Sequence, residues 1–169
     1  MGQARKITQI GIDEVGRGPI AGPVTLCALA FLEGFKITDK NIKDSKKLTK
    51  TQREEWYKKI LIFKKEGKVD FAVFSISANQ IDKIGISKSI KICLEKCLNK
   101  LNAKPSDKIL LDGSLYAPEK YKNQKTIIKG DEKEKVIALA SIIAKVTRDR
   151  YMYKQALKLP NFGFERHVG

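Results

Sequence analysis

The sequence predicts a mixed α/β layer fold, in which a sheet carries helices on both faces. Short apolar runs rich in β-branched residues alternate with longer segments whose apolar residues recur at helical spacing. Three strands early in the chain and two later ones, with helices between and after them, favour layers with the first strand in the centre. A length of 169 residues, 42% of them hydrophobic, suits a single domain over residues 1–169.

The N-terminal half is predicted to form two strands, a helix and a third strand. The apolar run 6–12 ends in two acids, and Pro and Gly residues then turn the chain into the apolar run 24–32. Apolar residues at helical spacing predict a helix to about residue 65 that either Thr49 or Thr51 can cap, and residues 51–54 fit a capping box. The run 69–76 alternates in polarity, as a half-buried strand does.

The C-terminal half is predicted to form two helices and two short strands. An apolar stripe over 77–102 predicts a helix with a break at Gly85. The runs 108–112 and 126–128 are short and apolar, and each is followed by an acid and a glycine, so both are predicted as strands. Residues 133–157 carry a continuous apolar face and are predicted as one long helix.

Charge and composition narrow the classes of partner. The chain has 34 Lys and Arg against 19 Asp and Glu, a net charge of +15, which favours a polyanion such as nucleic acid, although a lysine-rich proteome would give the same excess. No apolar stretch is long enough to span a bilayer. Cys27, Cys93 and Cys97 lack metal-like spacing and favour buried thiols in the cytoplasm. We expect a monomer.

Four acids follow or end the predicted strands. If those strands are neighbours, their carboxylates converge at one edge of the sheet, and such a cluster requires a cation to offset repulsion. Carboxylate ligands without His or Cys favour Mg²⁺ or Mn²⁺, and a pair of such ions is typical of phosphodiester cleavage. The alternative is four unrelated surface acids. This acidic cluster comprises Asp13, Glu14, Asp112 and Asp131.

A Gly-Arg-Gly loop, residues Gly16, Arg17 and Gly18, directly follows the first two acids. Glycines on both sides leave the backbone bare, so a phosphate or sugar could approach the N–H groups and the guanidinium together. Asp13 and Glu14 point to opposite faces unless the strand ends or bends there. The alternative to a binding loop is an ordinary polar turn.

Several motifs in order together resemble a known family. The chain closely resembles type 2 ribonuclease H, specifically bacterial ribonuclease HII. The resemblance implies the ribonuclease H-like fold, a five-stranded mixed sheet flanked by helices on both faces. It also implies cleavage of RNA in RNA/DNA hybrids and incision 5′ of single ribonucleotides in duplex DNA, giving 5′-phosphate and 3′-hydroxyl ends. The motifs are Asp13-Glu-Val-Gly-Arg-Gly18, Asp44-Ser-Lys-Lys-Leu48, Leu111-Asp-Gly113, Lys129-Gly-Asp131 and Ala140-Ser-Ile-Ile-Ala-Lys-Val-Thr-Arg-Asp-Arg150.

The resemblance also implies roles for individual residues. The acidic cluster looks like the metal-binding catalytic carboxylates, and the Gly-Arg-Gly loop like the segment that recognises the ribose 2′-hydroxyl and the adjoining phosphate. Lys46 and Lys47 look like phosphate contacts. Without the resemblance, these residues favour a solvated loop. Lys145 and Arg148 could follow backbone phosphates, although Arg148 could equally pair with Asp149 inside the fold.

The end of the sequence departs from the family pattern. In the family, the segment that resembles 160–169 continues into a tyrosine that stacks on the junction sugar, and a further helix follows. We therefore expect the usual C-terminal segment to be missing after Gly169. The alternative function is a non-catalytic domain that binds RNA/DNA hybrids. Another nuclease or transferase of the same fold is disfavoured by the Gly-Arg-Gly loop.

Overall fold

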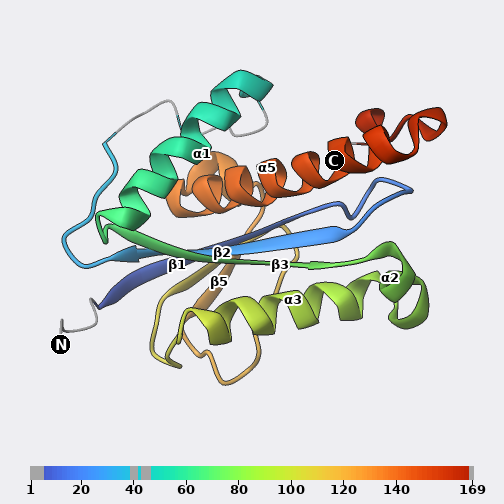
Figure 1. The fold of residues 1–169 in the computed structure, drawn as a ribbon. Helices are drawn as coiled ribbons and strands as arrows, with labels where there is room; N and C mark the ends of the chain where they lie inside the picture. The colour runs from blue at the N-terminus through green and yellow to red at the C-terminus, as the bar shows by residue number, and fades with distance from the viewer. Residues whose placement is uncertain (1–5, 39–41, 43–46, 168–169) are drawn as a thin grey trace.

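A five-stranded mixed sheet with the first strand in its centre organises the chain (Figure 1). The computed structural model describes residues 6–38, 42 and 47–167. β2 runs antiparallel to β1 and β3, whereas β4 runs parallel to β1 and β5. The mixed sheet and the central first strand confirm the predicted architecture. In spatial order the strands are β3 (Val69–Ile76), β2 (Val24–Leu32), β1 (Ile7–Val15), β4 (Ile109–Asp112) and β5 (Gln124–Ile127).

Helices cover both faces of this sheet and form two apolar cores. Figure 1 shows α1 and α5 on one face and α2 and α3 on the other. Within the described ranges, no helix has the length and apolarity that crossing a bilayer would require. The helices are α1 (Lys50–Lys65), α2 (Ala78–Ile84), α3 (Ile86–Lys100), α4 (Gly130–Lys133) and α5 (Lys135–Lys158), followed by the 3₁₀ turns η2 (Pro160–Phe162) and η3 (Phe164–Arg166).

Of the two candidate caps of α1, Thr49 is the one that the structure uses. The capping box consists of Thr49 and Gln52, not of residues 51–54. The Gln52 N–H donates to the Thr49 hydroxyl at 3.2 Å, and the Thr49 N–H donates to the Gln52 side chain at 2.8 Å. Both boxes match in sequence, and the chain uses the earlier one, which adds two residues of helix before 52.

The long C-terminal helix predicted over 133–157 is confirmed as α5, which begins two residues later, after a corner in the chain. Glu134 adopts an extended backbone between α4 and α5, with φ −119° and ψ 116°. The Glu134 N–H donates to the Gly130 carbonyl at 2.7 Å, at the end of α4. The Glu134 carbonyl accepts a hydrogen bond from the Ile137 N–H at 3.0 Å, at the start of α5. This corner separates the short α4, which carries Asp131, from α5. Apolar periodicity did not predict α4, because the residues that this short helix buries are Gly130 and Asp131.

Helix α5 lies against the backbone of the central strand at Gly11. A Cβ atom at this position would lie 2.4 Å from the Val136 carbonyl carbon and 2.6 Å from the Ile137 nitrogen. Such distances are too short for a side chain, and the obstructing atoms are backbone atoms that cannot rotate away. Gly11 therefore permits the start of α5 to pack directly on β1.

We predict that Gly11→Ala lowers the free energy of unfolding by about 3 kcal/mol, because a methyl group forces α5 away from β1. Gly18→Ala is the matched control, since a Cβ at Gly18 has no neighbour within 4 Å. Urea unfolding followed by circular dichroism measures both variants. Equal midpoints for the two variants would contradict the proposed close packing.

Candidate active site and nucleic-acid interface

Asp13 and Asp112 lie beside each other at one edge of the sheet. Parallel pairing of β1 with β4 places Ile12 opposite Leu111, and the next residue of each strand is an aspartate. Side chains alternate along a strand. Because Gly11 faces α5, Asp13 also faces α5. The sheet register, set by apolar residues, thus brings two acids together.

The short helix α4 is attached to the end of β4 by a hydrogen bond. The Gly130 N–H donates to the Asp112 carboxylate at 2.6 Å. A Cβ at Gly130 would lie 3.2 Å from the same oxygen, so glycine permits this approach. Asp131, the next residue, is fully buried. Asp131 therefore lies on a short helix whose first residue is hydrogen-bonded to Asp112.

Glu14 points to the other face of the sheet, because β1 continues through both acids to Val15. Its carboxylate lies 3.8 Å from the Arg17 guanidinium, which also donates to the Ser114 hydroxyl at 3.1 Å. Across the described part of the chain, no three His, Cys, Asp or Glu side chains stand close enough to enclose a metal ion. Asp13 and Asp112 therefore share the face of the sheet toward α5, whereas Glu14 lies on the opposite face.

Burial raises the pKa of the Asp13 carboxyl well above its usual value of 3.8. A hydrogen bond from the Ser141 hydroxyl lowers this pKa, the negative charges of Asp112 and Glu14 raise it, and the Glu14 N–H, 2.8 Å from the carboxylate, lowers it. An ionised Asp13 thus carries an unfavourable charge in a buried place. A cation at this position would relieve that penalty.

The donor set fits a hard divalent cation. All four members of the acidic cluster offer carboxylate oxygens, which Mg²⁺ and Mn²⁺ prefer, and no His or Cys is among them. Such an ion would offset the burial and the like charges that raise the pKa of Asp13. Asp13 and Asp112 share a face of the sheet, so they are placed to bind the same ion.

The two glycines of the Gly-Arg-Gly loop have different surroundings. Gly16 has φ +97°, and a Cβ there would lie 2.4 Å from the Pro23 carbonyl oxygen. At Gly18 a Cβ would meet nothing within 4 Å. The fold therefore requires glycine at 16 but not at 18, where the backbone remains accessible from outside.

Arg17 extends from this loop into solvent, with half of its side chain exposed. It lines an open pocket of about 320 Å³ together with Ser87 and Lys91 of α3. Two cations and a hydroxyl around an open pocket beside the acids suit a phosphate backbone. Lys47 is exposed, whereas Lys46 lies outside the described residues.

The predicted phosphate contact by Arg148 is wrong. The side chain is fully buried, and its guanidinium donates to the backbone carbonyls of Ala21, Pro23 and His167. Asp149 is not its hydrogen-bond partner either, since Asp149 accepts from Lys145 at 2.9 Å. Lys145 is largely buried in that ion pair, and its contact with phosphate stays a prediction.

Three groups at the site were not predicted from the sequence. Ser141 donates to Asp13, Ser114 accepts from Arg17, and the Gly130 N–H binds Asp112. Ser141 occurs in the sequence only as an unassigned member of the motif over 140–150. A lone hydroxyl on an otherwise apolar helix face is the signal that would have identified it.

We predict that, without divalent ions, the parent protein loses stability as pH rises above 3.8, because folding raises the pKa of Asp13 and the folded state then binds more protons. Asp13→Asn removes the buried charge, so its unfolding midpoint should exceed that of the parent at pH 8 and approach it at pH 4. Urea unfolding in EDTA measures this. The exposed Asp82→Asn is the control, with an expected change within about 0.5 kcal/mol. A less stable Asp13→Asn at pH 8 would contradict the electrostatic account.

Comparisons with known proteins agree with this geometry. A family model described as ribonuclease HII matches residues 10–169. The chain is 44% identical over 160 residues to a ribonuclease HII of Shouchella clausii, covering 94% of this chain and 58% of that protein. It is 38% identical over 159 residues to a ribonuclease HII of Coxiella burnetii, covering 94% and 75%.

A solved structure shares the fold. The ribonuclease HII of Archaeoglobus fulgidus, determined in a complex with PCNA, superposes with a TM-score of 0.69 at 26% identity, over 93% of this chain and 80% of that one. The chain spans little more than half the length of the Shouchella clausii relative. The family match covers nearly all of the chain, including every member of the acidic cluster and the Gly-Arg-Gly loop. The chain therefore belongs to the ribonuclease HII family.

Proposed function

We propose that this chain is a metal-dependent endonuclease that hydrolyses the RNA strand of RNA/DNA hybrids. We further propose that it incises duplex DNA 5′ of a single embedded ribonucleotide, leaving 5′-phosphate and 3′-hydroxyl ends. The observation that supports this best is the meeting of Asp13 and Asp112 at one sheet edge, beside the Gly-Arg-Gly loop. A net charge of +15 supplies the attraction for a polyanion.

The carboxylates would hold the metal ions. Mg²⁺ or Mn²⁺ bound as a pair supplies an activated water and stabilises the leaving oxygen in phosphodiester hydrolysis. Asp13 and Asp112 offer oxygens from neighbouring strands, and Ser141 and the Gly130 N–H orient them. Glu14 on the opposite face of the sheet and Asp131 on α4 are proposed as the remaining ligands.

The Gly-Arg-Gly loop would bind the strand that is cut. The accessible backbone at Gly18 allows a ribose to approach closely, and its 2′-hydroxyl distinguishes RNA from DNA. The Arg17 guanidinium is half exposed and can bind a phosphate through two donors. Lys91 on the far side of the same pocket, and Lys46 and Lys47 from their loop, are proposed as further phosphate contacts.

The cellular setting is proposed to be the cytoplasm, a reducing compartment. Cys27, Cys93 and Cys97 are buried free thiols in the structure, as expected where disulfides do not form. We propose that the chain acts as a monomer there on ribonucleotides left in DNA, as part of their repair.

We predict that Asp13→Asn lowers the rate of metal-dependent nicking by roughly 10³-fold or more, equivalent to about 4 kcal/mol, because a metal ligand is lost. Binding to the duplex should remain. The measurement is gel cleavage of a labelled DNA duplex with one ribonucleotide, in Mg²⁺, Mn²⁺ or EDTA, with Asp82→Asn as the control.

The substrates in this assay separate the alternatives. An RNA/DNA hybrid and an all-DNA duplex run beside the single-ribonucleotide duplex. Binding without cleavage by the parent would favour the non-catalytic domain, and cleavage of the all-DNA duplex would favour another nuclease of this fold. An Asp13→Asn variant as fast as the parent would refute the proposed metal site.

We predict that Arg17→Gln weakens binding of the single-ribonucleotide duplex about tenfold or more, since a charge-assisted contact to phosphate is lost. The slope of log affinity against log salt should become shallower by about 0.9. Fluorescence anisotropy in a salt series measures both. The control is Lys68→Gln, a half-exposed cation paired with Glu66 at the opposite end of the sheet. An unchanged salt slope for Arg17→Gln would exclude the phosphate contact.

A further inference from the structure

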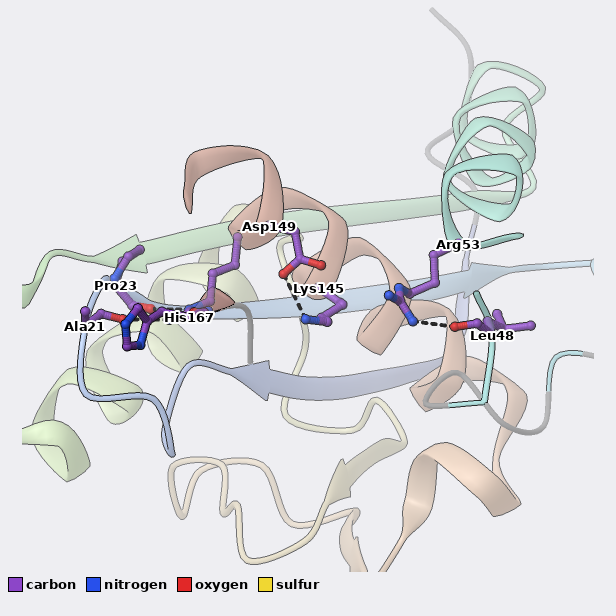
Figure 2. A network of polar contacts seen from close by, with 8 residues as sticks. Ala21, Pro23, Leu48, Arg53, Lys145, Asp149 and His167 are labelled. Carbon is purple, nitrogen blue, oxygen red and sulfur yellow. Dashed lines mark hydrogen bonds and ion pairs between the residues drawn. The ribbon is translucent and has the colours of Figure 1, made fainter. Parts of the chain in front are cut away.

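A fully buried arginine connects three distant parts of the chain. Arg148 of α5 donates from Nε to the Pro23 carbonyl at 2.8 Å and from Nη2 to the Ala21 carbonyl at 2.8 Å. From Nη1 it donates to the His167 carbonyl at 2.9 Å. Figure 2 shows Ala21, Pro23 and His167 gathered at one end of α5. A planar guanidinium can serve several carbonyls at once, whereas a lysine ammonium lacks that fixed geometry.

Glycines let the chain close around this guanidinium. A Cβ at Gly16 would lie 2.5 Å from the Arg148 Nε, and a Cβ at Gly22 would lie 3.2 Å from its Nη2. Both glycines have φ above +90°, where other residues are strained. The Gly-Arg-Gly loop and the turn that follows it are therefore shaped around Arg148, and not only toward a ligand.

Different groups hold the acids. Asp13 is positioned by strand pairing and by Ser141, and Asp112 by the Gly130 N–H. None of these contacts includes Arg148. A change at Arg148 should therefore displace the loop that carries Arg17 and Gly18 while the carboxylates keep their places.

We propose that Arg148 is a positioning residue that locks the segment 16–23 onto α5 and onto the segment ending at His167, and thereby sets substrate affinity. The identity of the substrate rests on the proposed function. The three hydrogen bonds from Arg148 to backbone carbonyls, which we call the lock, are contacts in the structure. Arg148 touches neither the reacting atoms nor the acids. It acts through the loop, so it contributes to binding of the ribonucleotide strand and not to the chemical step.

The kinetic test uses Arg148→Gln on the single-ribonucleotide duplex. A loosened loop binds ground state and transition state equally poorly, so KM should rise while kcat stays close to that of the parent. The expected rise in KM is between about 10- and 100-fold, the scale of an ångström-sized misplacement. A merely structural role would instead lower kcat with the folded fraction and leave KM unchanged, which would overturn the proposal.

A second measurement needs no activity. Trypsin cuts after arginine, and Arg17 and Arg166 lie at the two ends of the lock. Brief digestion followed by mass spectrometry should show faster cleavage at both sites in Arg148→Gln than in the parent. If the parent does not nick the duplex, the proposed function fails, and this digestion alone decides whether the lock exists. If trypsin cuts Arg148→Gln faster than the parent at both sites while KM is unchanged, the proposed role of Arg148 in substrate affinity is overturned.

The control separates the lock from general loss of stability. Ile60→Ala removes a fully buried side chain of α1, on a different helix from the lock. All variants are compared at a temperature where circular dichroism shows them folded. Ile60→Ala should keep the parent KM and show no preference for cleavage at Arg17 and Arg166. Arg148→Lys, which keeps the charge, should change KM in the same direction but less, and serves if Arg148→Gln does not fold.

Discussion

The rest of the structure depends on the approach of α5 to β1 at Gly11. Because no side chain intervenes, the backbone of α5 at Val136 lies on the central strand. Because α5 packs so closely on β1, Ser141, which lies further along α5, can donate a hydrogen bond to Asp13. It also fixes the corner before α5, so that Gly130 reaches the Asp112 carboxylate. One missing Cβ thus determines how the helix layer meets the acids.

The central strand serves two purposes with two adjacent residues. Asp13 faces α5, where burial and like charges raise its pKa. Glu14 faces the opposite side and lies near Arg17. Strand alternation therefore separates a buried carboxylate from one that lies near the Gly-Arg-Gly loop. The fold tolerates the unfavourable charge at Asp13 because the surrounding apolar cores stabilise the sheet on both faces.

Sequence patterns predicted the elements well where burial was simple. The runs 24–32 and 69–76 coincide with β2 and β3, and β2, which is buried along nearly its whole length, is a continuous apolar run in the sequence. The short helix α4 was missed, because its buried residues, Gly130 and Asp131, form no apolar pattern. Arg148 was misassigned because sequence gives charge but not the carbonyls that distant turns supply. The acids were singled out because each lies at or just beyond the end of an apolar run, whereas the donors to Asp13 and Asp112 from Ser141 and Gly130 come from tertiary packing.

The buried thiols give this chain internal reporters of its own opening. Burial raises the pKa of Cys93 to about 11 and that of Cys97 to about 12, and Cys27 is fully buried in β2. Alkylating reagents attack thiolates, which are scarce and sheltered here at neutral pH. Cys97 also donates to the Ala72 carbonyl at 3.4 Å, on the face opposite α5. The rate at which each thiol is modified would therefore record how often its side of the sheet separates from its helices, without any added label.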